Sequence, residues 1–216
     1  MSPTSARTSM RGMSLVELMV AVCILGTVLG SMAIVSRSGK DLYESGSLRS
    51  DLRTRTSRAL ERIMAELRVA DAASLDGFAE TPFWDGRIEF DRVESVSTAD
   101  GSVDWTSVRL AFEQVPGEAD DGIDNNGDGL VDEGRVVLTV GSGTANEQTV
   151  VLCTGVSRLA EGEADNGEDD NGNGLIDETG LSFERSGDTV TVRLTLRRGD
   201  DTCTLATSLL LRNRTS

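Results

Sequence analysis

The order of apolar and polar residues sets the first part of the chain apart. Residues 13–35 are almost wholly apolar, and Glu17 is their only charged side chain. As a helix rising ~1.5 Å per residue, this segment would measure roughly 35 Å, long enough to cross a bilayer core of ~30 Å. The pattern therefore predicts a membrane-spanning helix close to the amino terminus.

After this segment, apolar or small residues recur every three or four positions, the spacing of one face of a helix. They are Leu48, Leu52, Thr56, Ala59, Leu60, Ile63, Met64 and Leu67. We therefore expect one helix from Ser14 to about Val69, amphipathic over residues 36–70. Because glycine destabilises helix interiors, we expect a break or softening near Gly39 and Gly46.

Beyond residue 80 the pattern changes to the alternation of strands. The expected strands are Arg87–Val96, Trp105–Val115, Arg135–Val140, Thr149–Val156, Leu181–Phe183, Thr189–Leu196 and Cys203–Arg212. A glycine turn at residues 198–201 would join the last two as a hairpin. A long helix followed by strands predicts an α+β protein, in which an antiparallel sheet packs on the carboxyl half of the helix. Residues 71–216 would form this β-rich globular head.

The composition of the chain argues against two classes of function. The formal net charge is −15 and the chain has no histidine. An acidic surface disfavours a nucleic-acid partner, which needs clustered Lys and Arg. The missing histidine removes the commonest general base and the commonest nitrogen ligand of zinc. We therefore expect no nucleic-acid partner and no enzyme activity.

The chain has three cysteines, and two of them fall in predicted strands. Cys153 and Cys203 would pair as a disulfide if the head folds in an oxidising compartment, although two buried thiols fit the pattern as well. Cys23 lies in the apolar segment, where it serves as a small packing residue.

The apolar segment has three possible interpretations. It is a secretory signal cut after the small residues 31–33, an uncleaved signal anchor, or a segment cut on its amino side. Glu17 favours the third, because a carboxylate inside a membrane helix costs ~2.5–3.5 kcal/mol unless it is paired. Cleavage between Gly12 and Met13 would create a charged α-amine about one helical turn from Glu17. The arginines at 7 and 11 favour a cytoplasmic amino end.

Residues 11–18 (Arg-Gly-Met-Ser-Leu-Val-Glu-Leu) resemble the processing site of type IV prepilins and pseudopilins. The shared elements are a basic leader ending in glycine, an apolar first mature residue, then Ser, and Glu as fifth mature residue. The resemblance implies a leader of residues 1–12, cleavage after Gly12 and N-methylation of Met13 by the prepilin peptidase. It also implies that Glu17 governs assembly into a filament. Met13 stands where the family more commonly has Phe.

The same resemblance implies a pilin-like fold and a non-catalytic role in a type II secretion or type IV pilus machine. The stretch Arg58–Arg68 and the ending Ser208–Asn213 look most like minor pseudopilin J and PilW-like minor pilins, a class that the family implies initiates or caps filaments. The resemblance also implies a single-pass protein of the bacterial inner membrane with its head in the periplasm or outside the cell. Its partners would be other pseudopilins or pilins. The alternatives are a calcium-dependent surface-binding module exported by the pilin route and an exported enzyme on a signal anchor.

An acidic segment occurs twice in the head. Residues 117–133 recur as residues 162–178 without a gap, and each copy has seven acidic residues and no basic one. Within each copy, oxygen-bearing side chains alternate and glycine stands sixth, as in the front half of an EF-hand loop. The two loops, residues 117–134 and 162–179, resemble the calcium loops of dockerins and thrombospondin type 3 repeats.

These loops predict calcium as a ligand. The candidate ligands are Asp124, Asn126, Asp128, Asp132 and Glu133 in the first loop and Asp169, Asn171, Asn173, Asp177 and Glu178 in the second. The twelfth position of an EF-hand holds a bidentate Glu, but here it is Arg135 or Gly180. We therefore expect weak sites, with dissociation constants of ~10⁻⁴–10⁻³ M, and the first loop as the stronger because it has Asp128 where the second has Asn173. The alternative is two solvated acidic loops without a ligand.

Overall fold

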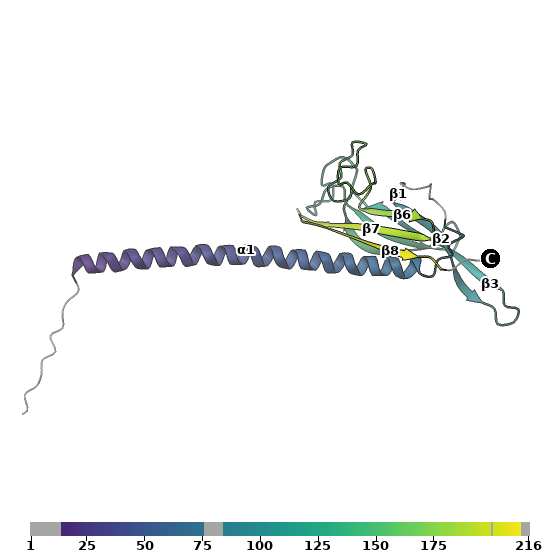
Figure 1. Cartoon of the computed structure of the whole chain (residues 1–216), viewed down its shortest axis with the longest axis horizontal. Helices are drawn as coiled ribbons and strands as arrows, with labels where there is room; N and C mark the ends of the chain where they lie inside the picture. The colour runs from purple at the N-terminus through teal and green to yellow at the C-terminus, as the bar shows by residue number, and fades with distance from the viewer. Residues whose placement is uncertain (1–13, 76–83, 200, 213–216) are drawn as a thin grey trace, which may run out of the picture. The chain divides into compact units, whose positions relative to one another are not determined.

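The computed structural model describes residues 14–75, 84–199 and 201–212 (Figure 1). The chain divides into two units, Met1–Ser47 and Leu48–Ser216. Helix α1, Leu15–Leu67, contributes residues to both units. It confirms the predicted long helix, but the expected break is absent, because the helical backbone continues through Gly39 and Gly46.

The described part of the first unit consists of the amino-terminal part of α1. Its segment Leu15–Arg37, 23 residues long, is long and apolar enough to cross a membrane. The large apolar side chains of this segment are exposed, among them Leu18, Val22 and Leu25. This confirms the predicted apolar helix, which has no covering partner among the described residues of this unit.

The second unit contains all eight strands of the described residues. They are β1 Trp84–Asp85, β2 Arg87–Val96, β3 Val103–Gln114, β4 Gly134–Val140, β5 Gln148–Val156, β6 Leu181–Ser186, β7 Thr189–Arg198 and β8 Asp201–Leu210. All seven predicted strands are confirmed, with ends that differ by at most three residues. The two-residue β1 was not predicted, because it is too short to show alternation.

The strands form one antiparallel sheet in the order β1-β6-β7-β5-β4-β3-β2. Both β6 and the end of β5 pair with one edge of β7, and β8 pairs with its opposite edge. The predicted hairpin of β7 and β8 is confirmed, with Arg198 paired to Asp201 and Gly199 in the left-handed conformation (φ 57°). The start of β4 pairs with the end of β5, at Gly134 and Val156. The β3–β4 and β5–β6 connections, which hold the two acidic segments, therefore lie at the same end of the sheet.

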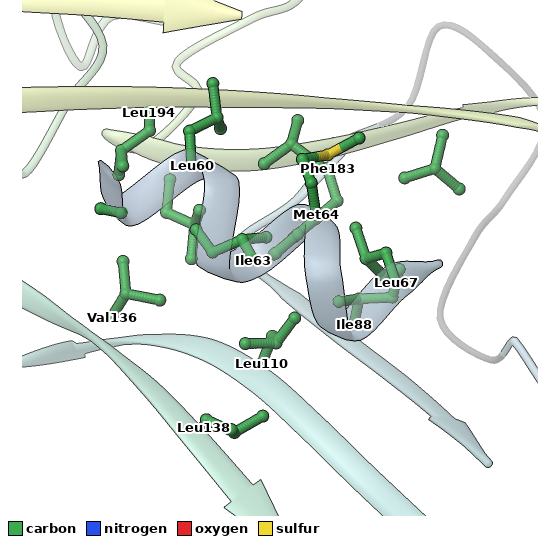
Figure 2. Close-up of a cluster of buried hydrophobic side chains, with 14 of the residues drawn as sticks. Leu60, Ile63, Met64, Leu67, Ile88, Leu110, Val136, Leu138, Phe183 and Leu194 are labelled. Carbon is green, nitrogen blue, oxygen red and sulfur yellow. The ribbon is translucent and has the colours of Figure 1, made fainter. Parts of the chain in front are cut away.

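The core of the second unit lies between the sheet and the carboxyl part of α1. Every residue of the predicted apolar stripe is buried except Leu48, which is 36% exposed. Figure 2 shows Ile63 and Leu67 of the helix among Ile88 of β2, Leu110 of β3 and Phe183 of β6. The α+β class and the packing of the sheet on the carboxyl half of the helix are therefore confirmed.

The structure does not join Cys153 and Cys203. Cys153 lies in β5 and Cys203 in β8, and these strands flank β7, since Leu196 pairs with Val156 on one side and with Cys203 on the other. Strands two places apart are ~9–10 Å from each other, beyond the ~7 Å Cα separation that a disulfide tolerates. Both thiols are free. Burial raises the pKa of Cys153 to about 11, so its reactive thiolate form is scarce at neutral pH.

Candidate functional site

The predicted processing site is only partly within the described residues. Gly12 and Met13 lie outside them, so their geometry is not described. Glu17 lies in the first turn of α1 and is exposed. The backbone N–H of Leu18 donates to the carbonyl of Ser14 at 3.0 Å, so the helix is regular around Glu17. A carboxylate in the first turn also interacts favourably with the helix dipole.

The two acidic loops are the β3–β4 and β5–β6 connections, and they gather at one end of the sheet (Figure 1). Arg158 joins them. Its guanidinium pairs with Asp165 of the second loop at 2.7 Å and also with Asp120 of the first, the equivalent position of the repeat. The hydrogen bond with Asp165 and that with Asp120 raise the pKa of Arg158. The loops are thus neighbours held by a shared arginine.

In the centre of each loop, one aspartate accepts hydrogen bonds from the backbone N–H groups of two glycines. In the first loop, the carboxylate of Asp124 accepts the backbone N–H groups of Gly127 at 2.6 Å and Gly129 at 2.8 Å. Asp169 makes the same hydrogen bonds to Gly172 and Gly174, at 2.7 and 2.8 Å. These bonds, that of Gly129 first, lower the pKa of Asp124. The alternating glycines have positive φ, which explains why glycine occupies these turns in both copies.

A second aspartate ties the end of each loop to its start. Asp132 accepts the backbone N–H groups of Asp121 and Gly122, the latter at 3.0 Å. Asp177 does the same in the second loop. Asp132 and Asp177 also have positive φ, 51° and 48°, a conformation that Asp adopts more readily than most residues. These aspartates therefore serve the folding of the loops.

Two glutamates converge on one asparagine in each loop. Glu118 Oε1 accepts the backbone N–H of Asn126 at 2.7 Å, and Glu133 Oε1 accepts its side-chain amide at 2.8 Å. In the second loop Asn171 is held in the same way, at 3.0 and 2.9 Å. We name Glu118 with Glu133, and Glu163 with Glu178, the glutamate pair of each loop.

The loops differ at one position of the repeat. Asp128 and Asn173 each accept the backbone N–H two residues on, at 2.9 Å. However, the Asn173 amide also donates to Glu178 Oε1, whereas Asp128 has no hydrogen to give. Burial raises the pKa of Glu133, and the charges of Asp128 and Glu118 raise it further, against the lowering effect of the Asn126 hydrogen bond. The surroundings of Glu133 are therefore more negative than those of Glu178.

The structure thus sorts the predicted calcium ligands into two groups. It brings Asn126, Asp128 and Glu133 together, and Asn171, Asn173 and Glu178. In the other predicted ligands, the aspartates at 124, 132, 169 and 177, both carboxylate oxygens accept backbone N–H groups. The prediction missed the first glutamate of each pair, Glu118 and Glu163, although the second position of both repeats is Glu. Among the described residues, no group of three or more Asp, Glu, His or Cys side chains is arranged so that it could hold a metal ion.

The chemistry of the glutamate pairs fits a hard cation. One oxygen each of Glu118, Glu133 and Glu178 is buried without a hydrogen-bond partner. A buried carboxylate oxygen needs a proton, a donor or a cation, because burial removes the water that solvates it. Oxygen donors are the ligands that calcium and magnesium prefer.

Comparison of the chain with protein-family models, with curated proteins and with solved structures finds no match.

Proposed function

We propose that the chain is a minor pseudopilin or pilin: a non-catalytic subunit of a type II secretion or type IV pilus machine. It would initiate or cap the filament, and calcium would stabilise its head. The observation that carries the proposal is the apolar helix Leu15–Arg37, with its single carboxylate near the amino end, which continues without interruption into the helix at the core of the head.

The exposed apolar segment supports a subunit that moves between a bilayer and a filament. Its side chains have no partner among the described residues of their own unit, so water is an unfavourable surrounding for them. A bilayer would cover the segment while the subunit is stored, and the equivalent helices of other subunits would cover it in a filament. Leaving the membrane for a helical bundle then keeps the apolar surface buried.

Glu17 supports the assembly step. A lone carboxylate in a bilayer is costly, and such residues usually pair or serve function. After cleavage behind Gly12, the amine of Met13, on the same or on a neighbouring subunit, would pair with Glu17 and fix the register between helices. The prepilin peptidase and the other subunits are then the partners of this segment.

The alternative is a calcium-dependent surface-binding module that uses only the pilin export route. The two acidic loops favour it, because they place their negative charge together at one end of the sheet. In this case the head would act by itself, and the helix would serve as an anchor.

Fractionation of the bacterial cells that express the chain distinguishes these functions. Filaments sheared from the cells are expected to contain the full-length chain at a small fraction of the main subunit, and deleting its gene should remove most filaments or stop secretion. Normal filament number and secretion in the deletion strain, together with absence of the chain from sheared filaments, would contradict the proposal and favour the binding module.

A further inference from the structure

Unpartnered buried oxygen atoms concentrate in the acidic loops. In the part of the chain that the structure describes, five buried side-chain atoms lack a hydrogen-bond partner, and three of them are carboxylate oxygens of the glutamate pairs. Glu133 and Glu178 are only 1% and 0% exposed. Their other oxygens accept amide hydrogens from inside the loop, so the carboxylates point into it. A positive partner would therefore stabilise these buried carboxylates.

The arginines that line the adjoining cavity are engaged with other groups. Asp128 and Glu133 line this cavity of about 380 Å³ together with Arg55, Arg197 and Arg198. The guanidiniums of Arg55 and Arg198 pair with Asp51, at 3.0 and 2.9 Å, and Arg197 Nε donates to the carbonyl of Gly199 at 2.9 Å. The unpartnered Glu133 Oε2 thus lies beside a cavity whose cationic side chains are engaged elsewhere.

We propose that the glutamates with an unpartnered buried oxygen are the ligand core of one divalent-cation site in each acidic loop. Glu118 and Glu133 would bind the cation in the first loop, with Asp128 as a third carboxylate, and Glu178 would bind it in the second. Glu163 and the aspartates at 124, 132, 169 and 177 then act as positioning residues, because both oxygens of each hold the loop backbone. This inference deepens the calcium part of the proposed function and rests on it only for a compartment that supplies the ion.

The donor set selects a cation of the calcium class. The sites offer carboxylate and amide oxygens, and the chain has no histidine to supply a nitrogen ligand. Calcium takes six to eight oxygen ligands in irregular geometry, including backbone carbonyls and water, which suits a glycine-rich loop. The first site should bind more tightly, since Asp128 adds a charge where the Asn173 amide already donates to Glu178.

Amide hydrogen exchange of the full-length chain in detergent tests the proposal, with calcium chloride as the probe. We expect calcium at about 10 mM to slow exchange across residues 118–133 and 163–178 about tenfold, as a site of ~1 mM dissociation constant requires. The same experiment with magnesium chloride shows the selectivity between the two ions. The readout is local to each loop, so the two sites are measured separately.

Two matched pairs of variants assign the ligands. Glu133→Gln should abolish the calcium effect in the first loop and leave it in the second, whereas Asp121→Asn should keep both effects. Asp121→Asn removes the same charge but introduces the residue that the second loop has at this place, Asn166. For the second loop, Glu178→Gln should abolish the effect, and Glu168→Gln, at an exposed site, should not.

The outcomes are decisive in both directions. Loss of the calcium effect in Glu133→Gln but not in Asp121→Asn supports the ligand core. If Glu133→Gln loosens the loop even without calcium, Glu118→Gln gives the same comparison. An unchanged calcium effect in the glutamine variants overturns the assignment, and an exchange rate of the wild-type loops that ignores calcium overturns the sites. Neither result bears on filament assembly, so the proposed structural role fails or stands separately.

Discussion

Glu17→Gln is expected to leave cleavage after Gly12 intact and to exclude the chain from filaments. A pair of unit charges 4 Å apart interacts by about 4 kcal/mol at an effective dielectric constant of 20, which corresponds to about three orders of magnitude in an assembly equilibrium. Glutamine keeps the size of the side chain and removes this interaction. It also lowers the cost of staying in the bilayer, so both changes favour storage over assembly.

The measurement is an immunoblot of sheared filaments beside the membrane fraction, with the mature amino terminus sequenced in both. Glu17→Asp is the control, because it retains the charge and should restore part of the incorporation. Equal amounts of wild type and Glu17→Gln in the filaments would contradict the pairing of Glu17 with the new α-amine.

Ile63→Asp is expected to unfold the head while the amino-terminal helix still inserts into the membrane. Ile63 is fully buried in a cluster that includes residues of β2, β3 and β6 (Figure 2). An uncompensated buried charge costs about 3–5 kcal/mol, and the lost apolar packing adds about 2–5 kcal/mol. The sum is comparable with the whole stability of a typical domain, about 5–15 kcal/mol.

Arg62→Asp is the matched control, because the neighbouring Arg62 lies on the exposed face of the same helix and receives the same new residue. Thermal unfolding of the full-length chain in detergent, followed by circular dichroism, measures both variants. The β-sheet signal of Ile63→Asp should be lost at room temperature, whereas Arg62→Asp should melt close to wild type. Similar melting of the two would contradict the role of the apolar stripe as the core.

The elements that depend on local pattern could be predicted from the sequence. The apolar stripe identified the buried face of α1 because a helix repeats its face every three to four residues, and only Leu48 differs. The start of β2 agrees with the prediction because buried Ile88 and Phe90 alternate with more exposed residues there. In contrast, Trp84–Asp85 becomes a strand only by pairing with β6, so no local pattern indicates it.

The features that depend on contacts between distant segments could not be predicted. The places of Cys153 and Cys203 in two predicted strands suggested a disulfide, but β7 separates these strands, which only the order of strands in the sheet reveals. The EF-hand comparison likewise considered only the loop that begins at Asp124 and so missed Glu118, which accepts a hydrogen bond from Asn126, eight residues away. One indication of these residues was present in the sequence: the second position of the repeat is Glu in both copies, Glu118 and Glu163.

The central claim is that a proteolytic cut directly before the apolar helix creates the amine that pairs with Glu17. Intact-mass and peptide mass spectrometry of the protein purified from its native membrane tests this most directly. The account predicts a mature chain that begins with N-methylated Met13. A chain that retains residues 1–12, or one that begins at Ile34 after cleavage by an ordinary signal peptidase, would contradict it.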